Sequence, residues 1–301
     1  MNQQTLTREY TFEGRGLHTG KYAHLTIQPA PANYGIRFVR TDVDVEVPAI
    51  ASAVSRTDRS TTISSGEVSV VTIEHIMSAL TGLGVDNARI LIDNEEVPIL
   101  DGSAEYYVRA IAPDGLQKQD AERVWIEFDE AFEVRDEQTG SWVRVEPAEE
   151  MSFDVTVDFG SRVLGIQKAS WSENTDYVGQ IAPCRTFVFM HELEFLAARG
   201  LVKGGDVDNA IVIVEHPVTP EQIDNMCKLF GQPHLAVTPK GYLSNLKLHF
   251  PNECGRHKLL DLIGDMRLMG GFPKAAISAY KPGHTINSMA SREALAKIKN
   301  L

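Results

Sequence analysis

The sequence has few cysteines. Only three occur in 301 residues, at Cys184, Cys227 and Cys254, and none forms a C-x-x-C pair. This pattern argues against a thiolate zinc site or a disulfide framework and leads us to expect a cytoplasmic protein. Cys184 and Cys254 lie near basic residues, so a cysteine nucleophile stays open as an alternative to buried structural thiols.

Long apolar runs and excess positive charge are also missing. The first residues, MNQQTLTREYTFEG, contain no signal-peptide core, and no run approaches the roughly 20 residues of a membrane-spanning helix. A formal net charge of −12 argues against nucleic acid as a partner, because phosphate binding needs clustered lysine and arginine. No dinucleotide-binding glycine motif or P-loop is present.

Short alternating segments predict strands throughout the chain, and a few apolar periodic segments predict helices. Strands are predicted at 10–14, 23–30, 35–39, 68–73, 87–93, 123–128, 131–136, 141–147, 152–159, 209–214 and 274–280. Helices are predicted at 73–84, from 103, at 190–200, 257–265 and 287–300, and a Gly-rich turn at 14–20. We therefore expect an α+β fold in two halves.

The pattern breaks in two places. Residues 113–120, PDGLQKQD, predict a linker between domains spanning 1–117 and 122–301. Residues 215–256 have weak periodicity and several prolines, which indicates an insertion in the second domain. His216, His234 and His249 lie in this segment, and each is interpreted as an ordinary polar or partly buried histidine.

The segment HKLLDLIGD places three polar residues on one helix face. His257, Asp261 and Asp265 are spaced i, i+4 and i+8 in an otherwise apolar helix. An apolar helix is buried, and a buried carboxylate must pair, hydrogen-bond or hold a metal. A helix-stabilising His–Asp hydrogen bond is therefore the alternative to a metal site.

His75 is the best third ligand for such a metal. It points away from the apolar stripe of its helix, toward a side of small residues that allows another segment to approach. Glu74 lies about 100° around the helix from His75 and could take a proton from water on the metal. The stripe consists of Ile73, Ile76, Met77 and Leu80, and the small residues are Ser78, Ala79 and Gly82.

Several polar residues elsewhere could complete the site. His284 follows Pro282-Gly283 at the end of a strand, where a loop histidine could stabilise an oxyanion or protonate a leaving amine. Thr186 offers a hydroxyl donor, and Lys258 and Lys281 offer positive charge. A surface-loop histidine and an ordinary strand threonine are the alternatives for His284 and Thr186.

Several motifs in order resemble those of the UDP-3-O-acyl-N-acetylglucosamine deacetylase family, the zinc amidases of lipid A biosynthesis in Gram-negative bacteria. The resemblance runs from about residue 5 to about residue 290. The motifs are GRGLHTG, TIEHIMSALTGLGVDN, VPILDGSA, CRTFVFM, HKLLDLIGD and YKPGHTIN.

The resemblance implies a metal site and a general base. His75, His257 and Asp261 match the zinc ligands, and iron(II) also suits such a set. Glu74 matches the general base.

Further residues follow from the same comparison of motifs. His284 matches the general acid or electrostatic partner, and Asp265 orients it. Thr186 helps to bind the oxyanion, and Lys258 serves substrate binding. Lys281 and Phe159 match positions associated with the nucleotide diphosphate.

The resemblance also implies an architecture. We expect two α+β domains with helices sandwiched between two mixed sheets and the active site in the interdomain cleft. An insert at about 184–205, FVFMHELEFLAARGLV with Phe187 at its start, should form an apolar passage for the acyl chain. The segment 215–256 appears as an extra insertion, longer than in typical members.

Partners and rival functions follow. The expected substrate is UDP-3-O-acyl-N-acetylglucosamine, deacetylated to acetate and a free amine. Some members continue into a fused hydroxyacyl-carrier-protein dehydratase; the 301 residues here leave no room for one, and a fused or associated dehydratase stays open as a partner. The alternatives are an amidase for another acylated nucleotide sugar, or a nucleotide-sugar-binding protein with a structural metal, whose site would be closed by four protein ligands.

Overall fold

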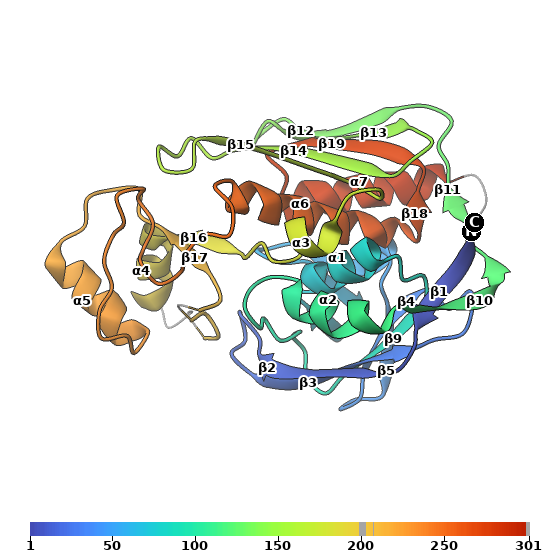
Figure 1. Cartoon of the computed structure of the whole chain (residues 1–301), viewed down its shortest axis with the longest axis horizontal. Coiled ribbons are helices and arrows are strands. Elements are labelled where there is room, and N and C mark those ends of the chain that lie inside the picture. Colours follow the sequence, from blue (N-terminus) through green and yellow to red (C-terminus); the bar gives the residue numbers. More distant parts are fainter. Residues whose placement is uncertain (199–202, 207, 299–301) are drawn as a thin grey trace.

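Two five-stranded sheets form the outer layers of the protein, and helices lie between them (Figure 1). This computed structural model describes residues 1–198, 203–206 and 208–298. Both sheets mix parallel and antiparallel pairs, because β4 and β9 run parallel in one sheet and β14 and β19 in the other. The expected α+β fold is confirmed.

The first sheet draws on the N-terminal half of the chain and the second on the C-terminal half. In sheet order, the first consists of β2 (Tyr10–Arg15), β3 (Tyr22–Pro29), β9 (Ala88–Ile92), β4 (Ile36–Arg40) and β5 (Val45–Pro48). The second consists of β12 (Phe132–Asp136), β13 (Ser141–Pro147), β19 (Ala275–Tyr280), β14 (Ser152–Asp158) and β15 (Ile166–Ser172).

Shorter strands and the helices complete the described fold. The short sheets pair β1 (Asn2–Leu6) with β10 (Leu116–Glu122), β11 (Trp125–Ile126) with β18 (Phe272–Pro273), β16 (Phe187–Phe189) with β17 (Ile211–Ile213), and join β6 (Val54–Arg56), β7 (Thr62–Ser65) and β8 (Val68–Val71). The helices are α1 (Glu74–Leu83), α2 (Glu105–Ile111), α3 (Tyr177–Gln180), α4 (Met190–Ala198), α5 (Pro220–Leu229), α6 (Glu253–Met266) and α7 (His284–Lys297).

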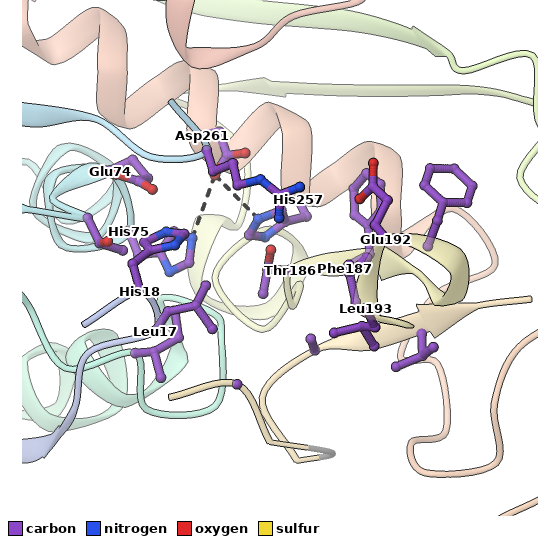
Figure 2. Close-up of a pocket in the computed structure, with 18 of the residues that line it drawn as sticks. Leu17, His18, Glu74, His75, Thr186, Phe187, Glu192, Leu193, His257 and Asp261 are labelled. Atoms are coloured by element: carbon purple, nitrogen blue, oxygen red, sulfur yellow. Dashed lines mark ion pairs between the residues drawn. The ribbon is translucent and has the colours of Figure 1, made fainter. Parts of the chain in front are cut away.

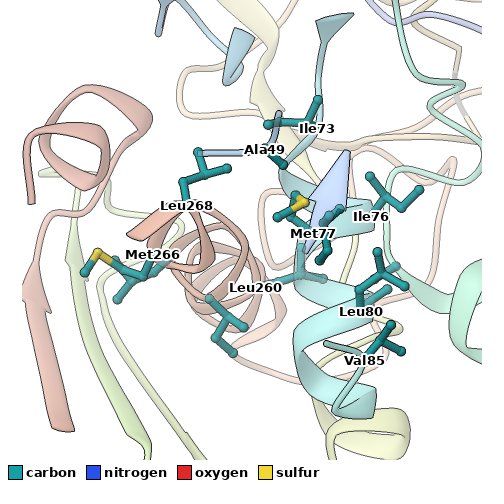
Figure 3. Close-up of a cluster of buried hydrophobic side chains, with 14 of the residues drawn as sticks. Ala49, Ile73, Ile76, Met77, Leu80, Val85, Leu260, Met266 and Leu268 are labelled. Carbon is teal, nitrogen blue, oxygen red and sulfur yellow. The ribbon is translucent and has the colours of Figure 1, made fainter. Parts of the chain in front are cut away.

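Helices α1 and α6 pack closely against each other in the layer between the two main sheets. The apolar stripe of α1 is buried in the same core cluster as Leu260, Met266 and Leu268 (Figure 3). A Cβ on Gly264 would lie 2.1 Å from the carbonyl oxygen of Glu74, so only glycine lets the first turn of α1 come this close to α6. Figure 3 labels Ile73, Ile76, Met77 and Leu80 of the stripe, together with Leu260 and Met266 of α6 and Leu268 just after it.

The described residues of the expected insert at about 184–205 fold together with the segment 215–256. They form a lobe beside the two main sheets, at the left of Figure 1, that carries α4, α5, β16 and β17. Thr219 and Gln222 form a capping box at the start of α5. The lobe has a small apolar core of its own, made of Met190, Leu193, Val212, Val214, Met226 and Leu243. Residues 199–202 of the insert lie outside the described residues.

Two local predictions are wrong. Residues 113–120 are no irregular linker, because β10 begins at Leu116 and pairs with β1. Its sequence LQKQDAE is almost entirely polar, so no alternation marks it as a strand. His284 does not lie in a loop but is the first residue of α7. The buried residues of this helix mix polar Asn287, Ser288 and Ser291 with Ile286, Ala290 and Ala294, so no clean apolar stripe marks its start. No helix among the described residues is long and apolar enough to cross a membrane.

Candidate active site

His75, His257 and Asp261 meet where α1 crosses α6 (Figure 2). Their candidate ligand atoms all lie within 4.8 Å of one another. Asp261 Oδ1 lies 3.7 Å from His75 Nε2 and 3.4 Å from His257 Nε2. Ligand atoms on one tetrahedral zinc, each about 2.1 Å from the ion, are roughly 3.4 Å apart. These separations therefore fit a shared metal ion.

The hydrogen bonds of this cluster also fit a cation. Asp261 Oδ1 is buried and has no hydrogen-bond partner among the described residues, whereas Oδ2 accepts from Lys258 Nζ at 2.8 Å. The Nδ1–H of His257 can donate to the Cys184 carbonyl oxygen at 3.0 Å, which leaves the Nε2 lone pair facing Asp261. A buried oxygen without a donor and two convergent imidazoles are what a divalent ion requires.

The protonation of the cluster favours metal binding. Burial lowers the pKa of His75 to about 3 and also lowers the pKa of His257, so both imidazoles are neutral at neutral pH. Burial alone would raise the pKa of Asp261, but the charges of His257 when protonated and of Lys258 outweigh it and hold that pKa below its ordinary value. Two neutral imidazoles and a carboxylate are ready to coordinate without losing protons.

Glu74, the first residue of α1, lies beside the cluster without being part of it. Its Oε2 accepts a hydrogen bond from the backbone N–H of Thr61 at 3.0 Å. Its Oε1 lies 3.9 Å from His284 Nε2. Burial raises the pKa of Glu74 to about 7, partly offset by the charge of His284. One oxygen of Glu74 is thus held by the backbone while the other faces the site.

His284 faces Glu74 from the start of α7. Its Nδ1 lies 3.0 Å from Asp265 Oδ2, so Asp265 orients the ring. Burial would lower the pKa of His284, but the carboxylates of Asp265 and Glu74 outweigh it and raise that pKa to about 9. His284 is therefore a cation at neutral pH, next to the buried carboxyl group of Glu74.

A cavity of about 420 Å³ opens beside these groups and continues into the lobe. Among the residues that line it are Thr186, Lys258, Phe187 and Phe159. Phe159 makes edge-on ring contacts with Phe187 and Phe189, at centroid distances of 5.6 and 6.1 Å. These four residues, which the sequence predicted to contact substrate, thus share one cavity with the ligand cluster. Lys281 is the exception, because it is not one of the lining residues. Its Nζ lies over the Tyr280 ring.

Two residues of the site were not singled out from the sequence. His18, in the GRGLHTG turn, lines the cavity, and its Nε2 is buried without a hydrogen-bond partner among the described residues. Thr61 touches Glu74, Asp265 and His284. His18 could have been found from the sequence, because it lies in the GRGLHTG motif. Thr61 could not, because it is one of several hydroxyl residues in RSTTISS and nothing in that segment distinguishes it.

Comparisons with known proteins identify the family to which this chain belongs. A family model described as UDP-3-O-acyl N-acetylglycosamine deacetylase (LpxC) matches residues 3–225 and 232–296. Only residues 226–231 interrupt the match, and they lie inside the segment 215–256 that we expected to be an insertion.

Curated relatives cover almost the whole chain. A UDP-3-O-acyl-N-acetylglucosamine deacetylase of Trichormus variabilis is 38% identical over 312 residues, 98% of this chain and 99% of that protein. The same enzyme of an Anaeromyxobacter species is 39% identical over 297 residues, 98% of this chain and 89% of that protein.

Other relatives are longer. A "Bifunctional enzyme LpxC/FabZ" of Bacteroides thetaiotaomicron is 41% identical over 301 residues, 99% of this chain, and the chain spans 65% of that protein's length. The family resemblance of the sequence motifs is confirmed by the family model and by these relatives together. The chain belongs to the UDP-3-O-acyl N-acetylglycosamine deacetylase family.

Proposed function

We propose that this chain hydrolyses the N-acetyl group of UDP-3-O-acyl-N-acetylglucosamine, releasing acetate and the free amine, as an early step of lipid A biosynthesis. The observation that carries the proposal is the meeting of three potential metal ligands with a buried carboxyl group and a histidine cation at the end of an apolar cavity. Family membership supplies the substrate and the reaction.

We propose zinc as the metal, held by His75, His257 and Asp261, although iron(II) also suits these ligands. When bound, the ion supplies a Lewis acid that polarises the acetamide carbonyl and lowers the pKa of a coordinated water to about 7. Three protein ligands leave a position open for water or substrate, whereas a structural zinc site is closed by four. Among the described residues the cluster offers three, which supports a catalytic role.

The chain's own residues supply the proton transfers. Glu74, as carboxylate, takes the proton of the attacking water through Oε1, because Thr61 already occupies Oε2. His284, as cation, donates from Nε2 to the leaving amine or stabilises the oxyanion, since Asp265 holds its other nitrogen. The hydroxyl of Thr186 lines the same cavity and donates to the oxyanion.

The remaining proposals concern substrate, partner and location. We propose that Lys258, Phe187, Phe159 and Lys281 serve substrate binding, the last two at the nucleotide diphosphate. The bifunctional relatives support a fused or associated dehydratase as a partner. We propose a cytoplasmic location, because the cysteines are free thiols and reducing compartments keep thiols reduced.

The direct test is product analysis with the purified protein loaded with zinc. We expect stoichiometric acetate and free amine from UDP-3-O-acyl-N-acetylglucosamine, measured by mass spectrometry. An acylated sugar without the nucleotide serves as the control for substrate class. No turnover of the nucleotide substrate, or faster turnover of the control, would overturn the proposal.

Shortening the acyl chain should weaken the reaction progressively. Phe187, Phe189 and Leu193 line the cavity, and each buried CH₂ contributes about 0.8 kcal/mol, or roughly fourfold in binding. A series of substrates that differ only in chain length should therefore show kcat/KM falling by roughly that factor per methylene until the passage is empty. Flat kinetics across the series would contradict an acyl passage at this place.

The plot of kcat/KM against pH should be bell-shaped. Glu74 acts only as carboxylate, so kcat/KM falls as pH drops through its pKa, about 7 in the metal-free site. His284 acts only as a cation, so kcat/KM falls as pH rises through its pKa of about 9. A bound divalent cation favours the carboxylate and moves the acid limb to lower pH.

The check is a kcat/KM profile of wild type and His284→Ala at equal metal content. The variant should be slow and should lack the alkaline limb. A variant with the wild-type rate and an unchanged bell would remove His284 from the mechanism.

A further inference from the structure

Thr61 connects the two proton-transfer groups of the site. It is completely buried and lies immediately before β7 in the N-terminal half of the chain. Its backbone N–H donates to Glu74 Oε2 at 3.0 Å. Its hydroxyl donates to Asp265 Oδ1 at 2.5 Å and lies 3.3 Å from His284 Nδ1. One residue therefore contacts the base, the acid and the carboxylate that orients the acid.

The hydroxyl fixes the rotation of the Asp265 carboxylate. Oδ2 accepts from His284 Nδ1 at 3.0 Å and from Asn287 Nδ2 at 2.9 Å. Oδ1 accepts from Thr61 alone among the side-chain donors of the described residues. Without the Thr61 hydroxyl, one oxygen of a buried carboxylate loses its donor, and the carboxylate is held through Oδ2 alone. The ring of His284, which depends on Oδ2, then loses its alignment toward Glu74.

The backbone of Thr61 aligns the other group. The Thr61 carbonyl accepts from Ile73 N at 3.4 Å, just before α1, while Glu74 reaches back to the Thr61 N–H. This reciprocal pair ties the segment before β7 to the first turn of α1. It leaves Glu74 Oε1 directed at His284 Nε2, 3.9 Å away.

We propose that Thr61 is a positioning residue that holds Glu74 and His284 in the relative geometry needed for proton transfer, acting through the carboxylate of Asp265. The inference rests on the proposed function, since it concerns the same reaction. It assigns a role to the hydroxyl that a residue of the same shape without a hydroxyl could not fill.

Three substitutions test the hydroxyl. Thr61→Val removes it with little change in shape, and Thr61→Ser keeps it. Thr62→Val is the matched control, because Thr62 is the neighbouring buried threonine and its hydroxyl makes no hydrogen bond to Glu74, Asp265 or His284. Kinetics are compared only after the metal content and the melting temperature of each variant have been shown to match those of the wild type.

Losing a hydrogen bond to a charged group corresponds to a fall in rate of about 10- to 100-fold. We expect Thr61→Val to lower kcat by that factor with KM changed by less than about twofold, and Thr61→Ser to restore most of kcat. Thr62→Val should keep the wild-type kcat. Wild-type kcat in Thr61→Val, or a serine variant as slow as the valine variant, would overturn the inference.

A double-mutant cycle separates positioning from a general structural effect. If Thr61 acts through His284, then Thr61→Val should lower kcat far less in a His284→Ala background than in the wild type. Equal factors in both backgrounds would overturn the inference. A wild-type protein that fails to deacetylate the substrate would overturn the proposed function and this inference with it, whereas the outcomes above leave the proposed function standing.

Discussion

Replacing His75 by alanine should abolish metal binding and activity together. His75 is the only member of the cluster that comes from α1, while His257 and Asp261 both come from α6. Without its imidazole, two ligands remain, and Asp261 Oδ1 keeps its 3.4 Å contact with His257 Nε2 alone. Since a catalytic zinc typically needs three protein ligands, we expect metal content near zero and acetate release at the limit of detection.

His24→Ala is the matched control for this prediction. His24 lies on β3, is exposed and pairs with Asp93 at 2.6 Å, and it belongs neither to the ligand cluster nor to the residues that line the cavity. Metal content by elemental analysis and rate by acetate release should both match wild type in the control. A His75→Ala protein that retains one ion per chain with undiminished affinity would show that the ligand set is wrong.

Glu74→Gln should separate the metal from the proton transfer. Glu74 lies next to a ligand, but it is not a member of the cluster, and one of its oxygens is committed to the Thr61 N–H. A glutamine keeps a carbonyl acceptor for that N–H but cannot take a proton from water. We expect full metal content and a fall in kcat of about 10²- to 10⁴-fold, the usual contribution of a positioned general base. Glu74→Ala should give the same result.

The control is Glu67→Gln, an exposed glutamate between β7 and β8 that undergoes the same chemical change away from the site. Its kcat and metal content should match wild type. Loss of metal in Glu74→Gln would make Glu74 a ligand and remove it as the base.

The sequence was most informative where a polar residue interrupts a regular spacing of apolar residues in a helix. The stripe His257, Asp261 and Asp265 is visible because Leu259, Leu260, Leu262 and Ile263 between these residues are apolar and buried. His75 and Glu74 follow from the same reasoning on α1. The structure brings all five to one place because α1 packs closely on α6 at Gly264, a contact between distant segments that no local pattern reports.

Other parts could not be derived from periodicity. The polar strand β10 is held by its pairing with β1, so its side chains carry no apolar signal. The first turns of α7 bury Asn287 and Ser291, which donate to the side chain and the backbone carbonyl of Asp265 on α6. Thr61 acquires its contacts only when the N-terminal half meets α6 and α7, so its importance depends on tertiary structure alone.

Titration of the metal-free protein with zinc tests the central claim most directly. The chelated protein should be inactive, and acetate release from UDP-3-O-acyl-N-acetylglucosamine should rise in proportion to bound zinc and reach its maximum at one ion per chain through His75, His257 and Asp261. Undiminished acetate release after complete removal of metal, or a rate that bound zinc fails to restore, would contradict the account.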